Sequence, residues 1–484
     1  MKMTRWGIAA MLALAATAPS SIARAYDPAT THAGLTERAA LASDLHRVLS
    51  HALSRPLGLF EPVGLSLAEL PTADAQSLEA RLATLDPSGG AAAGPDGVAP
   101  ALAWIIAGSI IATTPAERGQ DFFYDPSRGS GLSQSGSVAS VGNTLGLLFD
   151  AGGGFRPLFT GTQFNMTGRP STEWLRAPEN DVGLDAFYAT LEAAVAGDRP
   201  VVRATSLARA LMALGGVLTI LEDAGEPAHV RNDFRRTYLA SPGVSPFDRG
   251  SRFEQYVAET YGRMGLPAAG TPVHRPTVMA YITAADKQGL ADRTQSRFFS
   301  DGSLPEDAIV DRGATAAEVM ADARGSLPYA YPQLPRLELK VMGRRHYAYA
   351  KSKRRLLAYE RVPGRVRFFL DDAVYADTAR VLLPEIAGYG AGLINHLFRA
   401  EIRVEITGGV AQVTLAGAQG AVRKGQIRVF AEDGSGARRP AATLPPGSEP
   451  ARLAVPAGTR KIAAVLRGED DAGEFVAVGE ASVR

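Results

Sequence analysis

The pattern of apolar residues changes near the end of the chain's fourth hundred residues, and this change constrains the fold more than any other feature. Before it, apolar side chains recur at helical spacing, most clearly over 184–196 and 202–224. From Glu401 onward the apolar segments are short, β-branched or alternating, and Gly, Pro and Asp turns separate them. A chain of 484 residues is also too long for one ordinary core. The sequence therefore predicts a mainly α protein, with a multi-helix domain over 26–400 and a small β-sandwich over 401–484.

The first 25 residues have the composition of a secretory signal peptide. Lys2 and Arg5 precede an apolar run over 6–16, and Ala23-Arg24-Ala25 offers small residues where a signal peptidase cleaves. The apolar run is shorter than the roughly 20 residues that a bilayer span requires. We therefore expect 1–25 to be removed and the mature chain to start at Tyr26, to lack a transmembrane segment and to be secreted or periplasmic.

Composition limits the chemistry that the chain can carry. The absence of cysteine excludes disulfides and thiolate metal sites, so any metal ion must be bound by imidazole, carboxylate or the terminal amine. A net charge of +1 implies no global attraction to nucleic acid or to an anionic membrane. Any affinity for polyanions must be local.

The helical spacing can be assigned to individual segments. Helices are expected over 35–53, 73–85, 101–111, 184–196, 202–224, 252–262 and 371–398, with a break in the last at Pro384. The stretch 127–142 is rich in Ser and Gly and is expected to be a loop.

The richest chemistry lies where the helix over 202–224 ends. Thr219 and Asp223 are four residues apart and share one helix face, and His229 follows just after Pro227. A carboxylate and an imidazole at one helix end can bind the same cation. The alternative is that Asp223 caps or ion-pairs the helix end and that His229 is an ordinary loop histidine.

Four separated motifs resemble, in order, those of the zinc-dependent phospholipase C and single-strand nuclease family. His32 follows the expected mature N-terminus, and Phe122-Phe123-Tyr124-Asp125-Pro126 is similar to the family's His-Phe-Tyr-Asp-Pro. The stretch 219–229 resembles a family motif with a histidine four residues before an aspartate and then Pro-x-His, and Ser251-Arg252-Phe253-Glu254 resembles the end of His-x-x-x-Glu. The resemblance covers 26–399.

The resemblance implies a set of metal ligands that this chain keeps only in part. Family members bind three zinc ions through the terminal amine and carbonyl, five histidines, two aspartates and a glutamate. The matching groups kept here are those of Tyr26, His32, Asp223, His229 and Glu254. The vacated positions carry Ala112 or Thr113, Phe122, Thr219 and Gly250.

The losses are uneven, and they imply fewer metal ions. By this resemblance, the first zinc site keeps all its ligands, namely the groups of Tyr26, His32 and Asp223. The second site keeps only His229 and Glu254, and the third keeps only Asp223. We therefore expect one zinc ion or two, but not three. Asp121, Glu222 and Asp248 are neighbours that could replace lost ligands.

Two functions follow from this partial set. The first is an exported phospholipase C-like or nuclease-like protein, either a weak zinc-dependent phosphodiester hydrolase or a degenerate relative with at most one or two metals. The alternative is a non-catalytic binding or structural protein, a pseudoenzyme that retains the fold. The resemblance does not choose between them.

A basic segment over 336–367 is interleaved with tyrosines. It could bind phospholipid headgroups or other phosphate-bearing molecules, or it could be a solvated face of two strands or a helix. The candidates for anion binding are Arg344, Arg345, Lys351, Lys353, Arg354 and Arg355.

Overall fold

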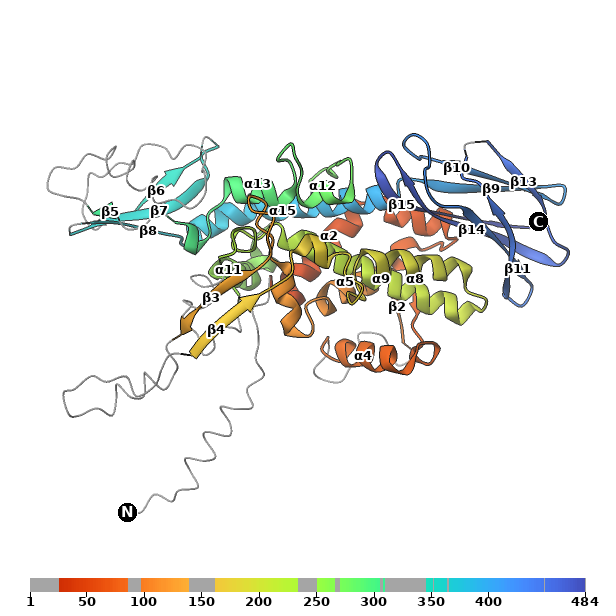
Figure 1. Cartoon of the computed structure of the whole chain (residues 1–484), viewed down its shortest axis with the longest axis horizontal. Helices are drawn as coiled ribbons and strands as arrows, with labels where there is room; N and C mark the ends of the chain where they lie inside the picture. The colour runs from red at the N-terminus through yellow and green to blue at the C-terminus, as the bar shows by residue number, and fades with distance from the viewer. Residues whose placement is uncertain are drawn as a thin grey trace, which may run out of the picture.

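The computed structural model describes residues 26–85, 97–138, 162–233, 250–265, 270–304, 308–309, 345–350, 352–363, 365–447 and 449–483. The expected signal peptide, 1–25, lies outside these ranges. Figure 1 shows a helical body in the middle, a β-sandwich at one end and a small sheet at the other. The predicted fold class, mainly α with a small β-sandwich after the helices, is confirmed.

The helical body is built around α9 (Pro200–Asp223). This helix begins at a proline, which suits a first turn because its missing N–H would have no partner there. Its C-terminal half is buried on every side. By length and composition α9 could cross a membrane, but 83% of that apolar window is buried inside the protein, as in a core helix.

Two glycines let α5 (Ala101–Ile111) lie unusually close to α9. A Cβ atom added to Gly108 would be 1.9 Å from the carbonyl oxygen of Met212. One added to Gly215 would be 2.0 Å from that of Ile105. Both distances are far inside van der Waals contact, so a side chain at either position would push the two backbones apart.

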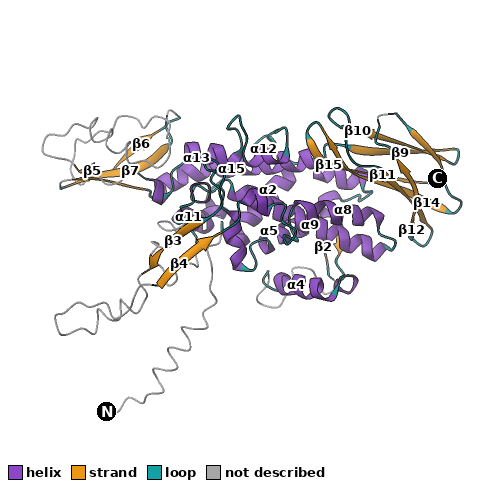
Figure 2. Ribbon diagram, in the orientation of Figure 1, coloured by secondary structure: helices purple, strands orange, loops and turns teal. Residues whose placement is uncertain are grey.

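Other helices cover this pair. The helix α8 (Leu184–Ala196) packs along α9, and α15 (Asp372–Leu397) runs the length of the body from the small sheet to the sandwich (Figure 1). Figure 2 shows the helices gathered in this body, with most strands at its two ends. The remaining α-helices are α2 (Ala33–Ala42), α3 (Leu45–Arg47), α4 (Thr72–Leu82), α7 (Ser171–Trp174), α11 (Arg252–Thr260), α12 (Val278–Ile282) and α13 (Leu290–Arg297). Shorter turns of other helix types are η1 (Pro28–His32), η2 (Val48–Ala52), η3 (Gly58–Phe60), η4 (Leu67–Glu69), η5 (Ala116–Phe122), η6 (His229–Arg231), η7 (Tyr261–Arg263) and η8 (Asp301–Ser303).

Two expected helices differ from the structure. The first, over 35–53, is interrupted at Ser43, which is extended and whose hydroxyl donates to the carbonyl of Ala40 and accepts from the N–H of Leu45. A serine that bonds the nearby backbone competes in this way with helical hydrogen bonds. The break expected at Pro384 is wrong, because α15 continues through that residue.

The stretch 127–142 is not wholly a loop. Its middle forms β3 (Ser133–Val138), which pairs antiparallel with β4 (Thr162–Thr167). A two-stranded ribbon satisfies backbone groups without needing an apolar pattern, which is why composition alone suggested a loop. Residues 139–161 lie outside the described part of the chain.

The β-sandwich consists of two antiparallel sheets. One has the order β13-β10-β9 and the other β12-β11-β14-β15. Apolar residues alternate along β10, where every second side chain is buried in the core between the sheets. The strands are β9 (Glu401–Thr407), β10 (Val410–Ala416), β11 (Ile427–Asp433), β12 (Arg438–Leu444), β13 (Ala451–Ala454), β14 (Thr459–Asp470) and β15 (Gly473–Ser482).

Smaller sheets complete the fold. At the other end of α15 lies an antiparallel sheet with the order β5-β8-β7-β6, and a two-stranded pair joins β1 and β2. Their strands are β1 (Pro62–Gly64), β2 (Val98–Pro100), β5 (Ala308–Ile309), β6 (Arg345–Tyr349), β7 (Arg355–Val362) and β8 (Arg365–Phe369).

Buried arginines join the sandwich to the helical body. Arg438, with 4% of its side chain exposed, donates from Nε to Glu432 at 2.7 Å and from Nη1 to the carbonyl of Val195 in α8 at 2.8 Å. It also pairs with Glu480. Arg203 of α9 reaches across the same junction to Glu432 at 3.1 Å. Charge-assisted hydrogen bonds therefore fix the sandwich against the helices.

Candidate functional site

The first part of the site pairs the start of α2 with the end of α9. His32 Nδ1 lies 2.5 Å from Glu222 Oε2, and His32 Nε2 lies 3.4 Å from Asp223 Oδ1. Thr36, one turn after His32, donates its hydroxyl to the other oxygen of Glu222 at 2.8 Å. All four side chains are buried. Both ring nitrogens of His32 therefore face carboxylates.

Burial and this pairing set the protonation of the first part. Burial raises the pKa of Asp223 to about 6, and the neighbouring His32 opposes that shift. Burial would lower the pKa of His32, but the charges of Asp223 and Glu222 and their hydrogen bonds outweigh it and raise the pKa to about 10. His32 is thus an imidazolium at neutral pH. Neither oxygen of Asp223 has a well-aligned hydrogen bond within the described residues.

The second part of the site is a buried group of Glu226, His229 and Glu254. One ligand atom from each of the three lies within 4.8 Å of the other two, so the group could bind a metal ion. His229 Nε2 is 3.6 Å from Glu254 Oε1. The side chains of His229 and Glu254 are 1% and 2% exposed, so water reaches them poorly.

Local structure holds each member of this group. Glu226 follows α9 and accepts from the backbone N–H of His229 at 2.8 Å and from the hydroxyl of Ser251 at 2.9 Å. Glu254 lies in the first turn of α11 and forms a capping box with Ser251. The ring of His229 stacks on Phe123, with centroids 4.1 Å apart. These contacts fix the three side chains before any ligand binds.

The electrostatics of the second part suit a cation. Burial raises the pKa of Glu226 to about 8, and hydrogen bonds from His229 and Ser251 oppose that shift. Burial lowers the pKa of His229 to about 3, so its imidazole is neutral, which is the form that binds metals. With a pKa of about 8, Glu226 is mostly protonated at neutral pH and has to lose its proton when a metal binds. Two carboxylates and a neutral imidazole are then a ligand set that divalent transition metals accept.

Tyr26 lies between the two parts. Its side chain is fully buried, and its hydroxyl donates to the carbonyl of Gly225 at 3.3 Å. Burial raises its pKa, and negative charge on Glu226, Glu254, Asp223 and Glu222 adds to the shift. The residue that we expect to become the N-terminus is therefore close to four buried carboxyl groups.

Two of the vacated positions, 219 and 112 or 113, lie near the close contact of α5 and α9. Thr219 donates its hydroxyl to the carbonyl of Ser109 at 3.0 Å, so its polar atom bonds the backbone of the neighbouring helix. Thr113 bonds the carbonyl of Ile110 at 2.9 Å, and Ala112 is buried at the end of α5. These residues satisfy their own polar groups within the helices.

The other vacated positions are also occupied by ordinary structure. Phe122 is 1% exposed and belongs to the hydrophobic core. Gly250 has a φ of +69°, which a residue with a side chain rarely adopts, and its carbonyl accepts from Gln255 at 3.1 Å. A histidine at this position would meet backbone strain.

Two of the inward-facing carboxylates were not assigned as ligands from the sequence. Glu222 was named only as a neighbour that could replace a lost ligand, and Glu226 was missed although it lies three residues before His229. Asp121 accepts instead from the backbone N–H of Arg169 at 2.7 Å, near the surface. Asp248 lies outside the described residues.

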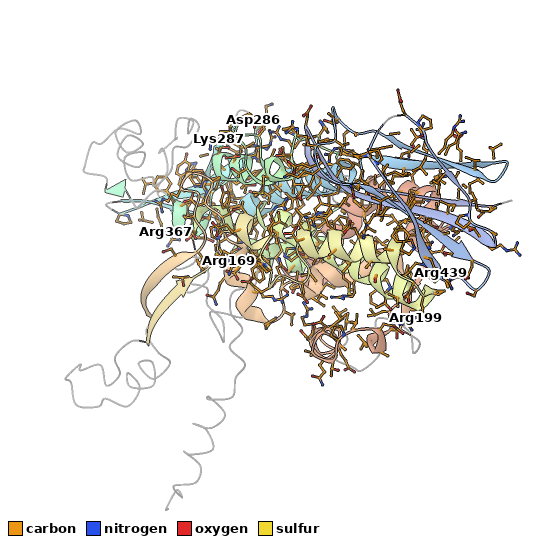
Figure 3. The ribbon with its side chains drawn as sticks, turned by 45° about the vertical axis from the view of Figure 1, so that its right-hand side comes forward. Arg169, Arg199, Asp286, Lys287, Arg367 and Arg439 are labelled. Carbon is orange, nitrogen blue, oxygen red and sulfur yellow. The ribbon has the colours of Figure 1, made fainter. Side chains whose placement is uncertain are left out.

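The basic segment uses several of its arginines internally. Arg345 donates to Asp371 at 2.9 Å, Arg355 to Asp377 at 3.2 Å, and Arg354 to the carbonyl of Arg297 at 2.9 Å. Lys353 is exposed, and Arg344 and Lys351 lie outside the described residues. Arg367 of the same sheet lies at the end of the molecule away from the sandwich (Figure 3) and pairs with Glu360 at 3.0 Å.

Comparison with known proteins gives a distant likeness. The chain matches no protein family and no curated protein sequence. Among solved structures it is similar to an alpha toxin from Clostridium absonum, with 13% identity, a TM-score of 0.27, and coverage of 95% of this chain and 96% of that one. It is also similar to a Clostridium perfringens alpha-toxin isolated from an avian strain, with 9% identity, a TM-score of 0.24, and coverage of 96% and 100%. At these scores the likeness carries no conclusion about activity.

Proposed function

We propose that this chain is an exported protein with a phospholipase C-like and nuclease-like fold that binds one divalent metal ion, zinc, at Glu226, His229 and Glu254. The ion serves as a structural or binding element rather than as the centre of an efficient phosphodiester hydrolase. The observation that carries this proposal is the buried group itself, whose ligand atoms lie within 4.8 Å of one another. A cation that displaces the proton of Glu226 would be bound by two carboxylates and a neutral imidazole at a buried site.

The geometry around His32 supports one ion rather than two or three. Both its ring nitrogens face carboxylates, at 2.5 Å to Glu222 and 3.4 Å to Asp223. With its pKa raised to about 10, His32 has a proton on each ring nitrogen and offers a metal no free lone pair, although its Nε2 has no well-aligned hydrogen bond within the described residues. In the first part of the site the imidazolium of His32 supplies the positive charge. The metal ion is therefore confined to Glu226, His229 and Glu254.

A single ion limits phosphodiester chemistry. Efficient hydrolysis of this kind uses two close metals that stabilise both the attacking and the leaving oxygen. Loss of one positive centre forfeits several kcal/mol of transition-state stabilisation, and about 1.4 kcal/mol corresponds to a tenfold change in rate. The burial of His229 and Glu254 also leaves little room for a phosphodiester to approach.

A second candidate is a weak single-metal hydrolase. Structural zinc sites usually have four protein ligands, whereas catalytic sites have three and keep one position for water. Among the described residues the group contributes three side-chain ligands, the number typical of a catalytic site. Burial of the same side chains opposes this reading, because a substrate has to reach the ion.

Metal analysis of the purified, signal-cleaved protein tests the proposal. After dialysis against a mild chelator, mass spectrometry should find one zinc ion per chain. The variant Glu226→Gln should lose that ion, whereas Glu69→Gln, a control carboxylate paired with Arg199 on another surface, should keep it. No bound metal in the wild type would overturn the metal site.

Activity distinguishes the two candidates. Hydrolysis of bis(p-nitrophenyl) phosphate that disappears in Glu226→Gln together with the ion would favour the weak hydrolase. Metal binding without such hydrolysis is the result that we expect.

Partners and location belong to the same proposal. The expected signal peptide supports secretion or a periplasmic location. The exposed Lys353 and the neighbouring arginines remain candidates for contact with phospholipid headgroups or other phosphate-bearing molecules. Cell fractionation and binding to anionic vesicles test these two points.

A further inference from the structure

A cleft of about 300 Å³ lies where the helical body meets the sandwich. It is formed by η2, the end of α15, and strands β9, β10 and β15. Small-molecule sites occur preferentially where two domains meet, and their volumes start at about this size. The lining residues are Arg47, Val48, Ala52, Phe398, Arg399, Ala400, Glu401, Arg403, Ala416, Gly417 and Val478.

Part of the cleft's lining is apolar and buried. Val48 and Phe398 are 6% and 8% exposed, and Val478 is 2% exposed. They come from η2, the end of α15 and β15, so three elements distant in the sequence build this wall. A short apolar chain that covered this wall would gain from leaving water.

The charged lining has one positive charge in excess. Three arginines, Arg47, Arg399 and Arg403, face one carboxylate, Glu401. Arg399 is neutralised by Asp470 at 2.6 Å, behind the lining. Glu401 accepts from Arg403 at 2.7 Å and lies 3.3 Å from Arg47, so these two guanidinium groups share one partner.

Arg399 supplies a second observation that points to a ligand. Its side chain is 7% exposed, and its Nη atoms donate to Asp470 and to backbone carbonyls of the sandwich. Its Nε has no hydrogen-bond partner within the described residues. A buried donor without a partner is costly, and an anion near Arg399 would relieve that cost.

We propose that this cleft binds a small amphipathic anion, a carboxylate or phosphate monoester on a short apolar chain. The anionic head is bound by Arg399, whose Nε lacks a partner in the part of the chain that the structure describes, together with Arg47 and Arg403 at the rim. The chain lies on the wall of Val48, Phe398 and Val478. The site is separate from Glu226, His229 and Glu254, so its failure would leave the proposed metal site untouched.

Calorimetric titration of the full signal-cleaved chain tests this proposal with octanoate, octyl phosphate, octanamide and inorganic phosphate. We expect both octyl anions to bind at one site per chain, and octanamide and inorganic phosphate to bind at least about tenfold more weakly, since each lacks one half of the recognised chemistry. Binding by octyl phosphate alone would indicate a phosphate headgroup, and binding by octanoate alone a fatty-acid-like carboxylate. Absence of binding by both octyl anions would overturn the proposal.

Variants locate the site. The double variant Arg47→Gln with Arg403→Gln should weaken octanoate binding about tenfold. Arg423→Gln is the matched control, because Arg423 is an arginine of the same sandwich, 60% exposed and paired with Asp471, that does not line the cleft. Ala52→Trp should fill the cleft and abolish binding with little change in the unfolding temperature. Unchanged binding in the double variant and in Ala52→Trp would place the anion elsewhere and refute the proposal.

Discussion

His32 and Glu222 form a short ion pair, 2.5 Å from Nδ1 to Oε2, in which both side chains are closed off from water. The pair joins the first helical turn of the described chain to the end of its central helix. Its contribution to the free energy of unfolding can be measured by changing the pH and by substituting Glu222.

We predict that Glu222→Gln lowers the free energy of unfolding by about 3 kcal/mol at pH 7, because it leaves a buried imidazolium with one charged partner fewer. The pKa of His32 is raised to about 10, so its stabilising contribution is fully present below about 6.5 and is lost as pH rises toward 10. Urea unfolding at pH 7 and pH 10 measures both effects. Thr36→Val removes only the hydroxyl that donates to Glu222 and should cost about 1 kcal/mol. Equal stability of Glu222→Gln and wild type at pH 7 would contradict the assignment.

Metal removal should lower the melting temperature of the wild type. An ion at a concentration about a thousandfold above its Kd stabilises the folded state by about 4 kcal/mol. Chelation should therefore destabilise the wild type, whereas Glu226→Gln should melt at the same temperature with and without chelator. A chelator effect of equal size in both proteins would show that the ion is bound elsewhere.

His396 should make the junction with the sandwich sensitive to acid. The residue lies near Tyr281, with ring centroids 5.7 Å apart, and burial lowers its pKa to about 4, helped by the charges of Arg399 and His274 and opposed by that of Asp470. The unfolded chain binds this proton more readily, so the stabilisation is complete above about pH 6.5 and is lost as pH falls toward 4.

His396→Gln should remove that dependence. Between pH 7 and pH 4 the wild type should lose up to about 3 kcal/mol more of its free energy of unfolding than the variant, as measured by urea unfolding. Comparing the two proteins cancels the titration of other groups. A constant difference over this range would refute the prediction.

Arg438→Ala should weaken the junction between the domains. The substitution removes the guanidinium that joins Glu432, Glu480 and the carbonyl of Val195, and the buried carboxylates keep only part of their pairing. We expect a loss of about 3 kcal/mol. Arg439→Ala is the control, because its side chain is exposed on the same strand (Figure 3) and the change should cost less than about 0.5 kcal/mol. Differential scanning calorimetry measures the effect. Two separate unfolding transitions in Arg438→Ala, one for each domain, would locate the loss at the junction.

The sequence predicted best those elements whose apolar pattern is strong and whose ends are marked. The bounds predicted for 101–111 and 184–196 agree with α5 and α8, where Pro100 precedes the first helix and Gly183 and Gly197 flank the second. The interruption at Ser43 and the ribbon of β3 and β4 were missed. Both depend on hydrogen bonds that the apolar pattern does not record.

The sequence predicted the site residues that match the family's ligands, but it did not predict the carboxylate of Glu226. His32 and Asp223 meet, as do His229 and Glu254. The resemblance directed attention to position 250, where the family motif has a histidine, whereas the structure brings Glu226 close to the same His229. The family motif assigns no role to position 226, so the resemblance alone does not predict this carboxylate. The proximity of Glu226 to His229 in the chain was the available signal.

The close contact of α5 and α9 also bears on how this protein can evolve. Gly108 and Gly215 have brought the helices so near that Thr219 reaches the backbone of Ser109. A histidine at position 219 would need space that the neighbouring helix fills. The backbone would have to separate first, at a loss of core packing that selection would oppose. The packing of the core therefore limits which side chains position 219 can accept, and a larger residue there would need compensating changes in α5 as well as in α9.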